Sequence, residues 1–384
     1  MTVNVALRLF AARACAWGLL IAAWIGLGSF ALRLAPTVTA GFALVAGWLL
    51  ALGAAATVAT RSDVTPRVRA TAIVLCAATA IVALAVAARG GGVVALAAAV
   101  LGCAALTALA SGVVRALRLA QPARPRPPVA AATAGALGAA WALGDIGDLP
   151  ALLLRFSIFV GLIAALLALL TLRLPATPRA PGCRAGLFDC SLPAWPAGAW
   201  RDARQWPTLL AGLAMLPMMA ALPLMVAWCR SEALAAQAVV LVHVAAMFVP
   251  ALALQRVIVR VSTASLSFVC ALLLAAGAAA LLTAPAPFDW MALAAAHGAA
   301  WSLAWSGALW APQRRARQGS SPLRAGAGYA LLTIGVGAVT AWLGARGVAA
   351  VHLALALAAV TAWVGATIVA FVARAQPGVP RVRP

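Results

Sequence analysis

The residues of this chain that could bind a soft metal ion are concentrated in one short window. Most of its methionines lie between positions 215 and 247, together with one of its three histidines. The window holds Met215, Met218, Met219, Met225, His243 and Met247. Thioether sulfur is neutral and polarisable, so together with imidazole it favours a soft cation over Mg, Ca or Mn. Zinc prefers thiolates, carboxylates or several histidines, and the donor types therefore point to Cu(I).

The spacing of these residues predicts that four of them meet. Met215 and Met219 are four residues apart, as are His243 and Met247, so each pair shares one helix face. If antiparallel helices cover 207–228 and 235–254, Met219 comes level with His243, and Met215 with Met247. Each pair alone is typical of packing. Their match in depth favours a copper site made of Met215, Met219, His243 and Met247 near the middle of both helices.

The composition shows what surrounds this window. Of 384 residues, 65% are hydrophobic and 9% charged, which is typical of an integral membrane protein. All 28 basic residues are arginines, and the net charge is +21. Because the arginines lie in short loops between apolar runs, we expect them to contact anionic lipid headgroups. We predict a protein of the lipid bilayer with no nucleic-acid partner.

Apolar runs of about 20 residues, the length that crosses a bilayer core, predict an all-α polytopic protein. The twelve predicted spans are 11–33, 38–60, 70–88, 92–114, 129–146, 150–172, 207–228, 235–254, 263–283, 291–312, 326–345 and 348–373. Most arginines fall in the loops that share a side with both termini, and the positive-inside rule therefore predicts N-in/C-in topology.

One long polar segment divides the spans into two sets of six. Residues 173–206 are rich in Pro, Gly, Arg and Trp, as expected of a cytoplasmic linker. We predict an N-terminal six-helix bundle at 1–172 and a C-terminal one at 207–384. This plan is that of major facilitator transporters. The loop RSDVTPRVR resembles that superfamily's acidic-basic signature in part, through Asp63, Arg67 and Arg69, with Pro66 at the usual glycine.

The M-x-x-x-M and H-x-x-x-M motifs resemble the signature of CcoA-type copper importers within that superfamily. The resemblance rests on Met215 with Met219 and on His243 with Met247. It implies a transporter rather than an enzyme, located in the bacterial inner membrane. Copper would be its imported substrate, supplied for assembly of cbb3-type cytochrome oxidases, and no prosthetic group is expected. We also expect a monomer that has a cytoplasmic copper chaperone as partner.

Other residues that could take part in binding or catalysis give weaker indications. The carboxylates all fall in loops or at span ends, and Arg155 inside a span is interpreted as snorkelling to the outer headgroups. Cys229 could pass copper inward and Cys183 and Cys190 could receive it, although free cytosolic thiols are the default interpretation. The remaining cysteines are interpreted as small apolar residues. They are Cys15, Cys76, Cys103 and Cys270. His297 and His352 are interpreted as structural.

Two other functions remain open at this point. The chain could be a major facilitator exporter of a hydrophobic or cationic organic compound, with the methionines lining an adaptable cavity. It could instead be a membrane-bound protein that holds haem or copper as a fixed redox centre. A retained cofactor in the purified protein would favour the redox protein, whereas uptake of radiolabelled copper would favour the importer.

Overall fold

The computed structural model describes most of the chain. The described residues are 2–35, 37–61, 65–119, 129–144, 148–174, 206, 210–211, 215, 233–258, 260–283, 288–310, 322–343 and 345–375. Their secondary structure is helical, without a strand in these ranges.

Six long helices form the N-terminal part. They are α1 (Thr2–Leu34), α2 (Val38–Arg61), α3 (Pro66–Ala88), α4 (Gly92–Leu119), α5 (Val129–Leu143) and α6 (Leu149–Leu172). The described helices after residue 206 are α8 (Ala233–Ala253), the short α9 (Gln255–Ile258), α10 (Thr263–Thr283), α11 (Phe288–Trp310), α12 (Pro322–Leu343) and α13 (Ala345–Ala375).

The predicted spans agree with these helices. Each predicted span except 207–228 coincides with one long helix, and most ends agree within four residues. The first helix is longer than predicted because it begins at Thr2. The span 207–228 lies outside the described residues, apart from 210–211 and 215. The protein is therefore an all-α polytopic membrane protein.

Length and hydropathy separate the helices into two groups. Seven described helices are long and apolar enough to cross a membrane, and three shorter apolar stretches lie in α5, α8 and α12. The first transmembrane helix, α1, is the most enclosed, with 94% of its apolar window buried, against 17% for α13. We infer that α1 packs at the centre of its bundle, whereas α13 faces lipid along much of its length.

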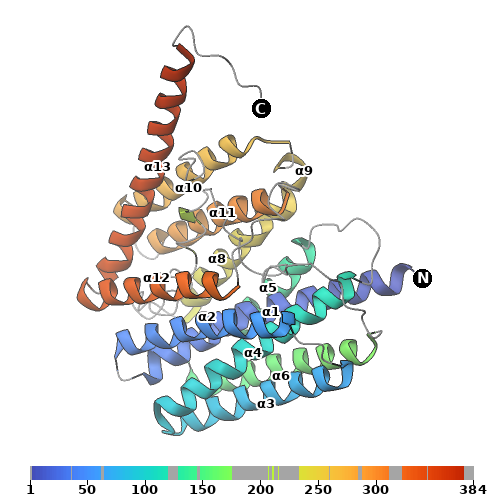
Figure 1. Ribbon diagram of the computed structural model, residues 1–384. Coiled ribbons are helices and arrows are strands. Elements are labelled where there is room, and N and C mark those ends of the chain that lie inside the picture. Colours follow the sequence, from blue (N-terminus) through green and yellow to red (C-terminus); the bar gives the residue numbers. More distant parts are fainter. Residues whose placement is uncertain are drawn as a thin grey trace.

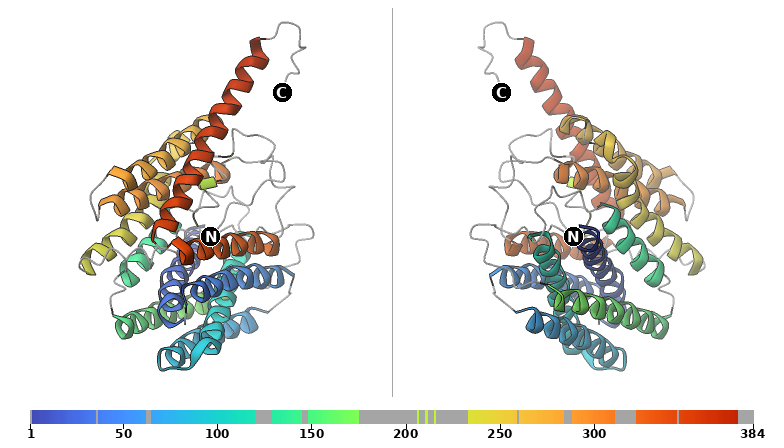
Figure 2. Two further views of the ribbon diagram at one scale, coloured as in Figure 1. Left: turned by 90° about the vertical axis from the view of Figure 1, so that its left-hand side faces the viewer. Right: turned by 90° about the vertical axis from the view of Figure 1, so that its right-hand side faces the viewer.

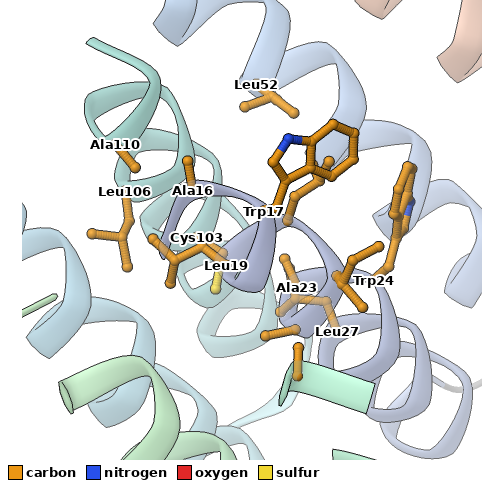
Figure 3. Packing of buried hydrophobic residues seen from close by; sticks show 14 of the residues in the cluster. Ala16, Trp17, Leu19, Ala23, Trp24, Leu27, Leu52, Cys103, Leu106 and Ala110 are labelled. Atoms are coloured by element: carbon orange, nitrogen blue, oxygen red, sulfur yellow. The ribbon is translucent and has the colours of Figure 1, made fainter. Parts of the chain in front are cut away.

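The packing around α1 accounts for its burial. It contacts α2, α4, α5 and α6. Its buried Trp17 lies next to Leu52 of α2 (Figure 3), and its buried Trp24 packs against Trp48 of α2. Cys103 of α4 lies in the same packed region (Figure 3). This agrees with the prediction that Cys103 is a small apolar residue.

Among the described helices, two pairs make the most extensive contacts between the two sets. Helix α12 packs along α2, and α8 packs against α5 (Figures 1 and 2). Gly337 permits the first of these contacts, because a Cβ atom at that position would lie 2.5 Å from Cβ of Phe42. Small residues allow membrane helices to approach this closely. Helices α8 and α12 therefore join the later helices to the N-terminal bundle.

The start of α3 explains one departure from the superfamily's loop signature. Pro66 occupies the first turn of α3, where its missing N–H costs nothing. Thr65 caps the helix by accepting a hydrogen bond from the Val68 N–H at 3.4 Å. Asp63 and Val64 lie outside the described residues. So does most of the predicted linker 173–206, and the domain boundaries and the N-in/C-in orientation stay predictions.

Candidate metal site

The candidate site is built on the pair α8 and α11. His243 Nδ1 lies 2.8 Å from the Ala294 carbonyl oxygen, and the Ala251 N–H donates to Ser302 Oγ at 3.1 Å. Both hydrogen bonds join residues 51 positions apart. The two helices therefore run parallel and in register over at least two turns.

A glycine and a proline bring these helices together. A Cβ atom on Gly298 would lie 2.7 Å from the His243 carbonyl oxygen and 3.2 Å from the Met247 nitrogen, so the backbones nearly touch there. Pro250 lies inside α8, where it removes a helical hydrogen bond. One residue later the Ala251 N–H donates to Ser302 Oγ of α11. The α8–α11 contact is thus fixed on both sides of Met247.

Three of the four predicted copper ligands are described and fully buried. Met215, His243 and Met247 each have no exposed surface. Met215 and Met247 belong to one buried cluster of packed side chains. Met219 lies outside the described residues, so its predicted place level with His243 stays a prediction.

The sequence interpretation missed the positions of the other histidines. The centre of the His297 ring, on α11, lies 6.1 Å from that of His243 and 5.4 Å from that of His352 on α13. All three side chains are buried. His297 and His352 were interpreted only as separate structural residues, and the structure joins them to His243 in one row.

A signal for this row was present in the sequence. His243, His297 and His352 follow the first residues of α8, α11 and α13 by ten, nine and seven positions. In the predicted topology these helices all begin on the same side, which gives the three histidines similar depths. Depth alone could not show that the helices are neighbours.

Most ring nitrogens of the three histidines lack a hydrogen-bond partner among the described residues. The buried nitrogens that make no hydrogen bond among the described residues are His243 Nε2, both nitrogens of His297 and His352 Nδ1. The carbonyl of Ala211 lies beside His297, outside hydrogen-bond geometry. Leaving a buried polar atom unpaired costs about 1–3 kcal/mol. Such a concentration of unpaired atoms is therefore expected where they bind something.

The partners of His243 and His352 determine which ring nitrogen can bind a metal. His243 Nδ1 forms a hydrogen bond with the Ala294 carbonyl oxygen, and His352 Nε2 lies 3.3 Å from the Leu274 carbonyl oxygen. A carbonyl only accepts, so each of these nitrogens carries the proton. The lone pairs are then on His243 Nε2 and His352 Nδ1. A backbone carbonyl that fixes the tautomer in this way is typical of metal-binding histidines.

The described residues add no further candidate ligand to this site. Among the described residues, no three His, Cys, Asp or Glu side chains converge as a ready metal-binding group. Cys15, Cys103 and Cys270 are buried and reduced, as expected for packing residues. Arg155 is partly buried on α6. Cys183, Cys190 and Cys229 lie outside the described residues.

An aromatic cluster lies directly beside the methionine and histidine residues. The rings of Trp17, Phe248, Trp301 and Trp305 contact one another with centres 5.1–6.4 Å apart. Trp17 belongs to α1, whereas the other three rings belong to α8 and α11. The cluster therefore packs the N-terminal bundle against the helix pair that carries His243 and His297.

Comparison with solved structures identifies the architecture. No family model and no curated protein matches the sequence. The nucleoside transporter NupG superposes with a TM-score of 0.63 at 17% identity, covering 95% of this chain and 99% of that chain. A bacterial homologue of the iron transporter ferroportin, in its outward-facing state, gives 0.54 at 15% identity, with coverages of 95% and 99%.

A third similar structure is FucP, a major facilitator superfamily transporter in the outward conformation. It gives a TM-score of 0.50 at 15% identity and covers 96% of this chain and 98% of that chain. The chain has the major facilitator fold. In transporters with this fold, the substrate sites lie near the bilayer midplane between the bundles. The buried residues on α8 and α11 belong to the later bundle and lie next to that interface.

Proposed function

We propose that this protein is a copper transporter that imports copper across the bacterial inner membrane through Met215, Met219, His243 and Met247. The observation that carries the proposal is His243. Its Nδ1 is fixed on the Ala294 carbonyl and its buried Nε2 has no partner among the described residues, while Met247 follows one helical turn later. An imidazole lone pair beside neutral sulfur favours a soft monovalent ion.

The fold alone does not select the substrate. The similar structures include a nucleoside transporter and a homologue of an iron transporter. The substrate must therefore be argued from the side chains at the binding depth. The acidic residues of the sequence fall in loops or at helix ends, whereas Met215, His243 and Met247 are buried within the fold. Ligands of this kind favour copper over iron or manganese.

Substitution of the sulfur ligands tests the proposal. Met to Leu nearly conserves volume and costs less than about 1.5 kcal/mol in a packed interior. Met215→Leu, Met219→Leu and Met247→Leu should therefore reach the membrane at near-normal levels. Each should reduce radiolabelled copper accumulation at least about tenfold, the effect that loss of about 1.4 kcal/mol of binding produces. His243→Ala should do the same.

Two methionines outside the predicted site provide matched controls. Met291→Leu makes the same change in a partly buried methionine of α11, and Met225→Leu makes it six residues beyond Met219. Both variants should retain uptake. In copper-limited cells, loss of uptake should appear as low cytochrome oxidase activity that added copper restores. If the three ligand variants take up copper at the wild-type rate, the methionines are packing residues and the copper proposal is wrong.

The organic-cation exporter remains a second candidate because of the aromatic cluster. Trp faces attract cations, and Trp17 and Trp301 each have a buried Nε1–H without a partner among the described residues. A cation site made of these rings would require them to separate, since they now contact one another. Efflux of a lipophilic cation that Trp17→Phe abolishes, without an effect on copper uptake, would favour this function.

A further inference from the structure

The structure assigns a second copper position between His297 and His352, next to the one proposed at His243. This inference rests on the proposed function for the identity of the ion. It concerns two histidines that the Met/His motifs do not include. His297 is the central residue of the row, because its ring centre lies 6.1 Å from that of His243 and 5.4 Å from that of His352. Both of its ring nitrogens, like His243 Nε2 and His352 Nδ1, make no hydrogen bond among the described residues.

The distances between the rings suit two-histidine coordination. Imidazole nitrogens bind a metal at about 2.0–2.1 Å, and the ring centre lies about 1.1 Å beyond the nitrogen. Two histidines on one ion then have ring centres about 5 Å apart at a tetrahedral angle and about 6.3 Å apart when linear. The observed separations of 5.4 and 6.1 Å both fall in this range. Small ring rotations would therefore suffice to bind an ion in either gap.

The row supports two adjoining positions rather than one three-histidine site. No three His, Cys, Asp or Glu side chains among the described residues converge on one point. A neutral imidazole has one lone pair, so His297 can bind an ion on the side of His243 or on the side of His352, but not on both. Its other nitrogen then carries the proton. With its lone pair toward His352, His297 is a ligand of the second position, and the site proposed at Met215, Met219, His243 and Met247 does not require it.

Backbone contacts hold the two outer histidines in suitable tautomers. His243 is fixed by the Ala294 carbonyl and His352 by the Leu274 carbonyl. The His352 ring also packs closely against Gly277, where a Cβ atom would lie 3.1 Å from His352 Nε2. Leu274 of α10 therefore holds one ligand of the second position, His352. The other ligand, His297 of α11, makes no hydrogen bond within the described residues. A ring without a fixed partner can turn its lone pair toward His352.

Equilibrium binding of silver(I), a soft ion of the same charge as Cu(I), tests the second position. The purified full-length wild type should bind two silver ions per chain. His352→Gln should bind one, because the Gln amide can still donate to Leu274 but offers no soft lone pair. The double variant His243→Gln, Met247→Leu should also bind one ion, and its combination with His352→Gln should bind none. Elution volume and thermal unfolding show whether each variant is folded.

X-ray absorption on the Cu(I)-loaded double variant identifies the ligands directly. The second position predicts a first shell of nitrogen without sulfur. A wild type that binds one ion, a His352→Gln variant that still binds two, or a sulfur shell in the double variant would each overturn the second position. Copper uptake separates this result from the proposed function. A protein that binds two silver ions but takes up no copper would support the second position and contradict the proposed import function.

Discussion

The close approach of α8 and α11 at Gly298 leads to the most specific prediction of the fold. Gly298→Ala would place a Cβ atom 2.7 Å from the His243 carbonyl oxygen and 2.9 Å from Ala246 Cβ. Ordinary contacts begin at about 3.4 Å, so the helices must separate by roughly 0.7 Å. Overpacking of this kind costs about 1–3 kcal/mol, and the better helix propensity of Ala returns up to about 1 kcal/mol.

The net effect of Gly298→Ala should be destabilisation by about 1–2 kcal/mol, measured as a fall of a few degrees in the unfolding temperature of the detergent-purified protein. The backbone shift should also lengthen the bond from His243 Nδ1 to the Ala294 carbonyl. Silver affinity should then decrease about tenfold, since the imidazole tautomer is no longer fixed.

A matched glycine on another helix provides the control. Gly335 of α12 has no atom within 4 Å of its ideal Cβ position. Gly335→Ala should therefore leave the unfolding temperature unchanged or raise it slightly, with silver affinity unaltered. A Gly298→Ala variant as stable as the wild type, with the same silver affinity, would refute the proposed role of this contact in positioning His243.

Three further outcomes are expected. Silver should compete with copper for uptake whereas manganese should not, because the ligands are soft; inhibition by manganese alone would indicate a different site. Reporter fusions at residues 190 and 384 should both report a cytoplasmic location, and an outside result at either position would contradict the predicted topology. Trp17→Ala should lower the free energy of unfolding by about 3–5 kcal/mol, measured by thermal or denaturant unfolding, because it removes a buried indole that contacts Phe248, Trp301 and Trp305. Wild-type stability in that variant would contradict the packing role of the cluster.

The sequence predicted the helical architecture in detail. Apolar run length determines which segments can cross a bilayer, since each backbone polar group must be satisfied within the helix there. The predicted span 263–283 coincides with α10, and 38–60 and 150–172 differ from α2 and α6 by one residue. The first helix was predicted too short, because residues 2–10, which include Asn4 and Arg8, continue the helix before the predicted span.

The sequence also identified part of the candidate site. Spacing of four residues placed His243 and Met247 on one face of α8, and both are buried. Whether they bind copper stays a proposal. Helical periodicity could not show which helix that face contacts, because periodicity describes one helix at a time.

Only the tertiary structure showed that His243, His297 and His352 form one row. These residues are 54 and 55 positions apart in the sequence and lie on different helices. Their proximity depends on Gly298, which lets α8 and α11 touch, and on Gly277, which lies against His352. Glycines permit such contacts because they have no side chain between the two helices. Hydropathy and motif spacing do not show where a missing side chain lets two helices touch. The sequence therefore determined which residues lie in the membrane, whereas the packing of the helices determined which of their side chains meet.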